Sequence, residues 1–324
     1  MTRAGAPPTC WVVTDGKPGM ESQCLGLAEA LGTAPIVKRV ALRTPWRQLL
    51  PYLRLGQANA FSAKGAALAP PWPDLLIASG RQSVAASLHV RAESRRAGQR
   101  TITVQIQDPV ISPAHFDLVI VPEHDRLKGA NVVTVLGALH RVTPDTLARE
   151  ADTFAPCVAH LPRPYLGVLI GGANAAYRFG EGEMATLAAA LRSAIEARGG
   201  SLLVTPSRRT GEANARVLRE ALEGVPAFIW EGEGANPYFG ILGLSDTLVV
   251  TCDSVNMVSE AVAAAKPVYV FDLPGGSPKF ARFHEAMRAR GWTRAFTGAL
   301  GDHAPAPKSD DMARAAEAVK ALLS

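Results

Sequence analysis

Short apolar segments alternate with longer mixed segments along most of the chain. The short ones are rich in valine, isoleucine and leucine and stop at glycine or small polar residues, as at Trp11–Thr14 and Tyr165–Ile170. The longer ones repeat apolar residues every three or four positions, which is the period of an amphipathic helix. Near-continuous apolar strands that alternate with helices are typical of parallel sheets covered on both faces. The pattern therefore predicts an α/β protein.

The expected elements form two series. The first contains strands Trp11–Thr14, Ile36–Ala41, Leu75–Ala78, Thr101–Gln105 and Leu118–Val121, and helices Glu21–Leu31 and Gln82–Ala97. The second contains strands Tyr165–Ile170, Leu202–Thr205, Ala227–Trp230, Leu248–Thr251 and Val268–Phe271, and helices Glu181–Arg198, Gly211–Leu222, Pro237–Leu244 and Ser254–Ala264. Right-handed crossovers bring the C-terminal ends of parallel strands to one edge of a sheet, where ligands bind.

A proline-rich stretch separates the two series. Residues 155–165 have the sequence APCVAHLPRPY, with three prolines from Pro156 to Pro164, a composition typical of a linker. The length of 324 residues also favours two domains over one. We therefore predict two doubly wound, Rossmann-like domains over residues 1–155 and 156–324, with the interdomain cleft as the expected ligand site.

Composition and charge narrow the class of ligand. Hydrophobic residues make up 48% of the chain and charged residues 19%, which suits a large core and excludes global disorder. The net charge of +5 is spread along the chain, and it favours anionic ligands such as phosphates, or an anionic membrane surface. Nucleic-acid binding is not expected, because only 6% of residues are aromatic and no basic stripe is present.

Cysteine spacing and hydropathy indicate the compartment. Cys10, Cys24, Cys157 and Cys252 are far apart and form no C-x-x-C pair or metal-ligand spacing, so we expect free thiols in a reducing environment. The sequence shows no apolar signal region near its N-terminus and no uninterrupted apolar stretch of about 18 residues. We expect a cytoplasmic protein, or one that is peripheral on the inner face of the membrane.

The first candidate ligand loop follows the predicted strand Tyr165–Ile170. It contains Gly171, Gly172 and Asn174, and a helix begins near Gly180. Two glycines allow close approach of backbone to a ligand, and the N–H groups of such a loop and helix favour an anion. A tight strand-to-helix turn is the alternative. The loop matches neither the G-x-G-x-x-G fingerprint nor the Walker A sequence.

Two further loops carry polar residues at predicted strand ends. Ser207, Arg208 and Arg209 follow the sequence LLVTP, where a hydroxyl and two guanidiniums are well placed for a diphosphate. The alternative is a solvated helix start with Thr210 as the N-cap.

The third loop lies within SDTLVVTCDSVNMVSEAVAAAKPVYVFDLP, residues 245–274. Its strand ends at Thr251, and Asp253 or Ser254 caps the following helix. The Glu260 carboxylate, near the middle of that helix, can accept hydrogen bonds from a ribose diol, while Ser254 and nearby N–H groups meet phosphate. The alternative is an ordinary βαβ unit with Glu260 on the helix surface.

This strand, loop and helix, with the sequence SEAVAAAKP over residues 259–267, resemble the donor half of GT-B-fold glycosyltransferases. In those enzymes the glutamate holds the donor ribose and the Gly-Gly loop faces the diphosphate, roles that the resemblance assigns to Glu260 and to Gly171 and Gly172. A GT-B chain often crosses back to its N-terminal domain, so the C-terminal segment is expected to pack there. The resemblance also implies a metal-independent mechanism, and the chain contains no D-x-D triplet. No metal or other cofactor is expected, because helix N-termini and basic side chains stabilise the leaving diphosphate.

Over nearly its full length the chain resembles the bacterial members of the mitochondrial-fission ELM family, a GT-B-fold glycosyltransferase-like family. The motifs that carry this resemblance are TDGKPGMESQCLGLAEAL, IASGRQSVAAS, QIQDP, VPEHD, IGGAN, TCDSVNMVSEA and GGSPKFARFHEAM. Plant members recruit a dynamin-related GTPase to mitochondria, a role that cannot apply to a bacterial chain. The resemblance implies a nucleotide-sugar donor bound by the C-terminal half and an acceptor bound by the N-terminal half.

The N-terminal half then supplies the acceptor and phosphate contacts. Gly16 and Lys17 follow the first predicted strand, and Gly80, Arg81 and Gln82 follow the strand Leu75–Ala78. Both places combine glycine with a basic side chain at the start of a helix, a combination that suits an anion.

An inverting transfer also needs a base that deprotonates the acceptor hydroxyl. Asp15, Asp108, Glu123 and His124 all lie at predicted strand ends, and we predict the base among Asp15, His124 and Asp108. His124 can equally be an ordinary loop histidine.

The stretch TPWRQLLPYLRLG, residues 44–56, combines Trp46 and leucines with arginines. It can rest on an anionic membrane and receive a lipid-linked acceptor, or form a helix packed against its own domain.

Three functions fit this set of residues. The first is a glycosyltransferase that moves a sugar from a nucleotide-diphosphate donor to a cell-envelope glycan or lipid-linked acceptor. The second is a non-hydrolysing nucleotide-sugar 2-epimerase. The third is a catalytically silent adaptor related to the organelle-fission factor.

Overall fold

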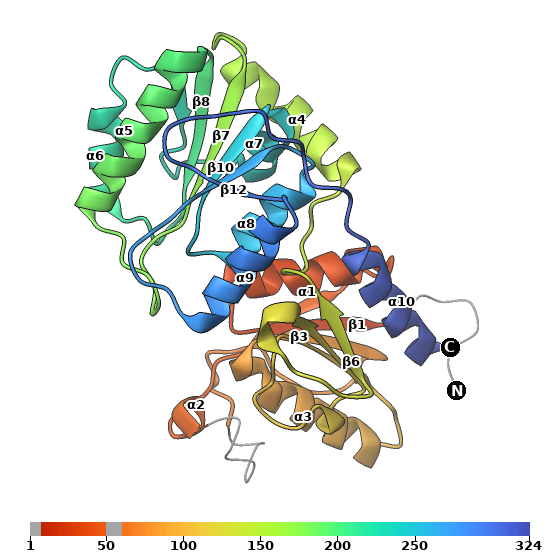
Figure 1. The fold of residues 1–324 in the computed structure, drawn as a ribbon. Helices are drawn as coiled ribbons and strands as arrows, with labels where there is room; N and C mark the ends of the chain where they lie inside the picture. Colours follow the sequence, from red (N-terminus) through yellow and green to blue (C-terminus); the bar gives the residue numbers. More distant parts are fainter. Residues whose placement is uncertain (1–7, 50–59) are drawn as a thin grey trace. The chain divides into compact units, whose positions relative to one another are not determined.

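The chain divides into two compact units in the computed structural model, which describes residues 8–49 and 60–324. The first unit comprises residues 1–141 together with residues 310–324, and the second comprises residues 142–309. Each unit contains a six-stranded, fully parallel sheet with helices packed on it, which confirms the predicted α/β class with two doubly wound units (Figure 1). The unit division falls between Arg141 and Val142, whereas the sequence places a boundary after residue 155.

The sheet of the first unit has the strand order β2-β1-β3-β4-β5-β6. Its strands are β1 (Cys10–Thr14), β2 (Ile36–Arg39), β3 (Leu75–Ser79), β4 (Ile102–Ile106), β5 (Leu118–Pro122) and β6 (Val132–Val135). The chain leaves β1 toward β2 on one side and returns to β3 on the other. The neighbouring strands β1 and β3 therefore form a topological switch point, where the connecting loops diverge and leave a crevice.

The helices of the first unit cover both faces of its sheet. They are α1 (Pro18–Ala30), α2 (Trp46–Leu49), α3 (Val84–Arg96) and α10 (Asp311–Leu323), with 3₁₀ turns η2 (Arg81–Ser83), η3 (Pro113–His115) and η4 (Glu123–Asp125). Val12 packs in the core that contains α1 and α10, whereas Trp11 and Val13 pack in the core that contains α3. This alternation follows from the two-residue period of a strand, and it explains why every residue of β1 is buried.

The sheet of the second unit has the strand order β12-β11-β10-β7-β8-β9. Its strands are β7 (Tyr165–Ile170), β8 (Ser201–Pro206), β9 (Ala227–Ile229), β10 (Thr247–Thr251), β11 (Val268–Phe271) and β12 (Arg294–Ala295). Its helices are α4 (Pro144–Val158), α5 (Glu181–Arg198), α6 (Glu212–Ala221), α7 (Tyr238–Leu244), α8 (Val255–Ala263) and α9 (Pro278–Ala289). Here β7 and β10 are the neighbours whose connections diverge, so the switch point lies between them.

The predicted linker is the main difference from the sequence analysis. Residues 144–158 form the helix α4, which packs on α7, so the linker interpretation is wrong as far as Val158. Pro156 lies near the end of α4, where the loss of one N–H donor removes only a terminal hydrogen bond. Phe154 and Val158 are the buried residues of α4, and the prolines from Pro156 to Pro164 are what favour a linker in the sequence.

Candidate functional site

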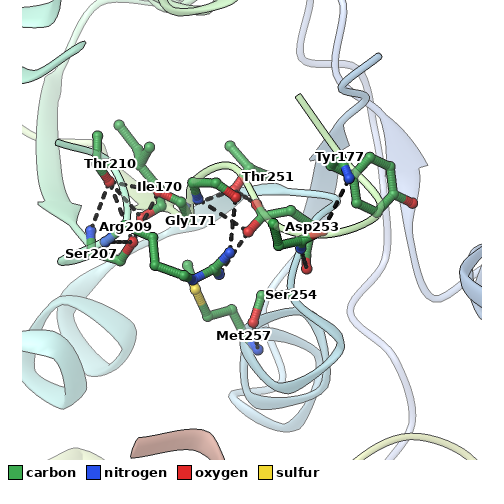
Figure 2. Close-up of polar contacts among 12 residues, drawn as sticks. Ile170, Gly171, Tyr177, Ser207, Arg209, Thr210, Thr251, Asp253, Ser254 and Met257 are labelled. Atoms are coloured by element: carbon green, nitrogen blue, oxygen red, sulfur yellow. Dashed lines mark hydrogen bonds and ion pairs between the residues drawn. The ribbon is translucent and has the colours of Figure 1, made fainter. Parts of the chain in front are cut away.

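The switch point of the second unit gathers three of the predicted loops. The loop after β7 begins with Gly171, the loop after β8 begins with Ser207, and the loop after β10 contains Asp253. Figure 2 shows that side chains from the second and third loops converge on the backbone of the first. The parallel register explains this convergence, because β7 pairs with β8 on one side and with β10 on the other.

Asp253 is the centre of this arrangement. Its carboxylate is fully buried, and Oδ2 accepts hydrogen bonds from the Gly172 N–H at 3.0 Å and from Arg209 Nη2 at 2.7 Å. Oδ1 accepts a bond from the Thr251 hydroxyl at 2.6 Å. Thr251 Oγ1 in turn accepts the Gly171 N–H at 2.8 Å. A buried charge is tolerated only when it is paired and hydrogen-bonded, and Asp253 meets that condition.

Gly171 and Gly172 leave space that other residues of the same unit fill. A Cβ at Gly171 would lie 2.2 Å from both carboxylate oxygens of Asp253, and a Cβ at Gly172 would lie 2.2 Å from the carbonyl oxygen of Arg209. Glycine is therefore required here by internal packing. The expectation that these residues allow close approach of a ligand stays a prediction, and their N–H groups are already bonded to Thr251 and Asp253.

The loop after β8 is held by its hydroxyl groups. The Ser207 and Thr210 hydroxyls both donate to the Gly171 carbonyl, at 2.9 Å and 2.6 Å. Thr210 does not cap α6, whose N-cap is Gly211, so the alternative interpretation of Thr210 is wrong. Arg209 Nη1 donates to the Gly172 carbonyl at 2.8 Å, and 42% of the Arg209 side chain is exposed. These bonds place a cation over the switch point.

The sequence does not distinguish Arg208 from Arg209, whereas the structure does. Arg208 is exposed and makes no hydrogen bond or ion pair with any residue that the structure describes. Arg209 is the arginine that belongs to the Asp253 network. Only the three-dimensional position of Asp253, far away in the sequence, makes this difference visible.

Several helices begin at this edge, and the N-termini of α5 and α8 differ in charge. Helix α8 has Ser254 as its N-cap, with the Ser254 hydroxyl accepting the Met257 N–H at 3.3 Å, and its first turn contains no acidic residue. Helix α5 carries Glu181 and Glu183 in its first turn, and Glu183 accepts the Gly180 N–H at 2.8 Å. A helix N-terminus favours an anion. Since α5 supplies carboxylates of its own, α8 is the better suited to an external anion.

The remaining part of the β7 loop is tied to the loops after β10 and β11. Asn174 is exposed, and its side-chain amide donates to the Asp253 carbonyl at 3.1 Å. The backbone of Tyr177 forms an antiparallel bridge with Gly275. Burial raises the pKa of the Cys252 thiol to about 11, so Cys252 is a packing residue in the neutral range.

Glu260 lies further along α8 than the Asp253 network, and it is hydrogen-bonded to Tyr238. It is 7% exposed, and its Oε2 accepts a hydrogen bond from the Tyr238 hydroxyl at 2.6 Å. Glu260 is therefore not the exposed surface residue of the alternative interpretation. Tyr238 carried no signal in the sequence beyond its place at the start of a predicted helix.

The switch point of the first unit brings together the two predicted acceptor loops. Gly16 has a positive φ of 81°, which lets the chain turn sharply from β1 into α1. Lys17 Nζ lies 2.6 Å from Asp15 Oδ2, with 64% of the Lys17 side chain exposed. Gly80 has a φ of 83°, and its Cα faces the side chain of Met20 from α1.

The other acceptor residues have partners within the same unit. Arg81 donates through Nη2 to the carbonyl of Gln48 in α2 at 3.1 Å, and Gln82 is half-buried in the turn η2. The Gly80 carbonyl accepts from Gln105 Nε2 at 3.2 Å. Arg81 thus links α2 to the turn after β3.

The predicted catalytic groups differ in accessibility. Asp15 is half-buried at the end of β1, beside Lys17. Asp108 Oδ1 accepts the Val110 N–H at 2.8 Å and closes a local turn after β4. The His124 side chain is only 4% exposed and has its Nε2 3.8 Å from Asp125 Oδ1. The choice of base among the three stays a prediction.

Most of the predicted membrane-contact stretch, residues 50–56 within 44–56, lies outside the described residues. The described part forms the short helix α2. Within residues 8–49 and 60–324, no helix combines the length and apolar character that a bilayer crossing needs.

Two doubly wound units, each with polar loops at its own switch point, define a protein of the GT-B fold class. Similar solved structures agree with this class. A UDP-GlcNAc 2-epimerase from Neisseria meningitidis, bound to UDP-GlcNAc, matches with a TM-score of 0.55 and 12% identity over 97% of this chain and 100% of that chain. Os79 from O. sativa, in complex with UDP, matches with a TM-score of 0.50 and 12% identity over 95% and 91%.

The chain belongs to the Mitochondrial fission ELM1 family, whose model matches residues 18–323. It is similar to the Mitochondrial fission protein ELM1 of Arabidopsis thaliana, with 32% identity over 278 residues. That alignment covers 78% of this chain and 64% of the plant protein, so the chain spans less than two thirds of that relative's length.

Proposed function

We propose that the second unit binds the diphosphate of a nucleotide sugar, and that the protein is a metal-independent glycosyltransferase. The acceptor in this proposal is a cell-envelope glycan or a lipid-linked intermediate, met in the cytoplasm at the inner face of the membrane. The observation that carries the proposal is the placement of Arg209 and the N-terminus of α8 at one switch point, both anchored through neighbouring residues Asp253 and Ser254.

The geometry of Arg209 supports an anion-binding role. A guanidinium has five N–H donors, and two nitrogens of Arg209 are bonded to Asp253 and Gly172 while 42% of the side chain stays exposed. The bonds to the protein fix its orientation, so less conformational entropy is lost when a ligand binds. The α8 N-terminus adds partial positive charge beside it. Together they stabilise a leaving diphosphate without a metal ion.

With the diphosphate at Arg209 and the α8 N-terminus, each of the other predicted residues has a proposed role. Glu260, on α8, receives the ribose of the donor. In the first unit Lys17 and Arg81 bind the acceptor, with Asp15, Asp108 or His124 as the base. The similar structures with bound UDP-GlcNAc and UDP support a uridine nucleotide as the first donor to test.

The two adjacent arginines provide a matched test. Arg209→Ala is expected to weaken UDP binding about tenfold, since hydrogen bonds to a charged group contribute about 1.5–3 kcal/mol. Arg208→Ala removes the same charge from the same loop and is expected to change the Kd less than about twofold. Isothermal titration calorimetry with UDP and UDP-GlcNAc measures both. Equal effects of the two variants would contradict the role of Arg209, and no binding of either nucleotide at millimolar concentration would contradict the proposed function.

A second candidate is an adaptor without catalysis. It is favoured by the internal pairing of the Gly171 and Gly172 N–H groups with Thr251 and Asp253, because donors that are already satisfied need no ligand. The plant relative is named a mitochondrial fission protein, and that name also fits an adaptor. Nucleotide binding that depends on Arg209 excludes it as the sole function.

A further inference from the structure

The start of α7 touches the middle of α8 through one hydrogen bond. Tyr238 is the first residue of α7, and its hydroxyl donates to Glu260 Oε2 at 2.6 Å. This distance is in the range of charge-assisted O–H···O⁻ bonds, which are about twice as strong as neutral ones. Glu260 is 7% exposed, so little water competes for that oxygen.

The Tyr238 hydroxyl is a permanent donor. Burial, and then the charge and hydrogen bond of Glu260, hold the pKa of the phenol well above its usual value. The phenol therefore stays protonated in the neutral range and keeps its proton available for Glu260.

A ligand hydroxyl that binds at Glu260 Oε2 meets the Tyr238 hydroxyl on the same oxygen. The proposed role of Glu260 is to accept hydrogen bonds from the ribose of a nucleotide, and a phenol O–H presents the same donor chemistry as a ribose O–H. Of the two carboxylate oxygens, Oε2 is the one at which a ribose hydroxyl competes with Tyr238. The apparent affinity of such a site falls in proportion to the fraction of molecules in which it is available.

We infer that Tyr238 is a built-in competitor for Glu260 and sets the affinity of the second unit for nucleotides. This inference rests on the proposed function. Nucleotide binding replaces the phenol on Oε2 by a ribose hydroxyl, and the Tyr238 side chain turns away.

The surroundings of Tyr238 allow that exchange. It follows the exposed segment 231–236, where Gly232 and Gly234 have positive φ values of 92° and 69°. Ile241 and Leu242, further along α7, are fully buried and keep the helix in place. Rotation of Tyr238 about its side-chain bonds therefore leaves the packing of α7 on the sheet intact.

Tyr238→Phe tests the inference because its two effects have opposite signs. The variant removes the competitor, so the Kd for UDP is expected to fall about tenfold. It also removes one hydrogen bond from a buried carboxylate, so the melting temperature is expected to fall. A purely structural contact would lower the melting temperature and leave UDP binding equal or weaker.

Tyr165→Phe is the matched control. The Tyr165 hydroxyl donates to the Val158 carbonyl at 3.1 Å, at the start of β7 and away from the loop edge. This variant is expected to lose thermal stability with no change in the Kd for UDP. In the double variant Tyr238→Phe/Glu260→Ala the gain in affinity is expected to disappear.

The outcomes separate the inference from the proposed function. If the wild-type protein binds UDP and Tyr238→Phe binds it no more tightly, the inference is wrong and the proposed function stands. If neither the wild type nor Tyr238→Phe binds UDP at millimolar concentration, the proposed function fails and the inference fails with it. Tighter binding by Tyr238→Phe, absent from Tyr165→Phe, supports both.

Discussion

At the scale of single residues, the loop edge of the second unit is organised by one buried carboxylate. Asp253 connects the β7 loop through Gly172, the β8 loop through Arg209, and its own strand through Thr251. It thereby occupies space that only glycine at position 171 leaves open. The same carboxylate orients Arg209, so the packing of the loops and the proposed anion site depend on one group.

The steric role of Gly171 gives a prediction about stability. Gly171→Ala places a Cβ 2.2 Å from the Asp253 oxygens, and overpacking of this kind costs about 1–3 kcal/mol. Gly182, inside α5, has no atom within 4 Å of a Cβ, so Gly182→Ala is expected to be neutral or to stabilise by about 0.5 kcal/mol. Urea unfolding curves measure both values. Similar unfolding curves for the two variants would contradict this prediction, because they would show that the β7 loop can move to accommodate the added Cβ.

At the scale of elements, the helices of the second unit differ in how well their N-termini suit an external anion. Several helices of the second unit begin at its loop edge, but α5 carries glutamates in its first turn and α8 carries none. The α8 cap, Ser254, stands next to Asp253 in the chain and orients the first turn of the helix. The N-terminus of α8 is thus the positive end that is placed beside Arg209.

Removal of the α8 cap is expected to affect both stability and binding. Ser254→Ala should cost about 1 kcal/mol of unfolding free energy and weaken UDP binding about threefold, because the first turn frays and its dipole is lost at the site. Thr143→Ala removes the cap of α4, where the Thr143 hydroxyl accepts the Thr146 N–H at 3.1 Å. It should cost a similar free energy with an unchanged Kd. Chemical denaturation and calorimetry separate the two effects, and equal Kd values for both variants would argue against α8.

At the scale of the whole molecule, the first unit is completed by the far end of the chain. Ala315, Ala316 and Val319 of α10 lie in the core that also contains α1 and the strands β3, β4 and β5. The Leu136 N–H donates to Asp311 Oδ2 at 2.8 Å. Residues as far apart in the sequence as Val12 and Val319 thus share one hydrophobic core, and α10 is an integral part of the first unit.

This closure predicts where a mutation in α10 acts. Val319→Ala removes two buried methyl groups and should lower the stability of the first unit by about 2 kcal/mol. Lys320→Ala, at the exposed neighbouring position, should change it by less than about 0.5 kcal/mol. Hydrogen exchange followed by mass spectrometry should show faster exchange in β4 and β5 for Val319→Ala and unchanged exchange in β7 and β8. Faster exchange in the second unit instead would contradict the assignment of α10.

The sequence by itself determined the class of fold and most of the elements. Apolar strands such as Tyr165–Ile170 can be predicted from the sequence, because a strand that is buried on both faces consists mainly of apolar residues. The cap of α8 could be narrowed to Asp253 or Ser254, because capping depends on neighbours three positions away, and the structure selects Ser254. The strand β6 and the helix α4 were not expected, because β6 is partly exposed and the prolines from Pro156 to Pro164 favour a linker over a helix.

Only the tertiary structure decided which polar residues work together. Asp253 and Arg209 are 44 positions apart, and Tyr238 and Glu260 are 22 apart, so no local pattern relates them. These pairs form because the strand order sets β7 between β8 and β10, and α7 and α8 lie on either side of β10 in the chain. Strands and helix caps depend on residues that are close in the sequence, so they can be predicted from it. The partner of a buried charge depends on the strand order, because the strand order brings distant loops to one edge of the sheet.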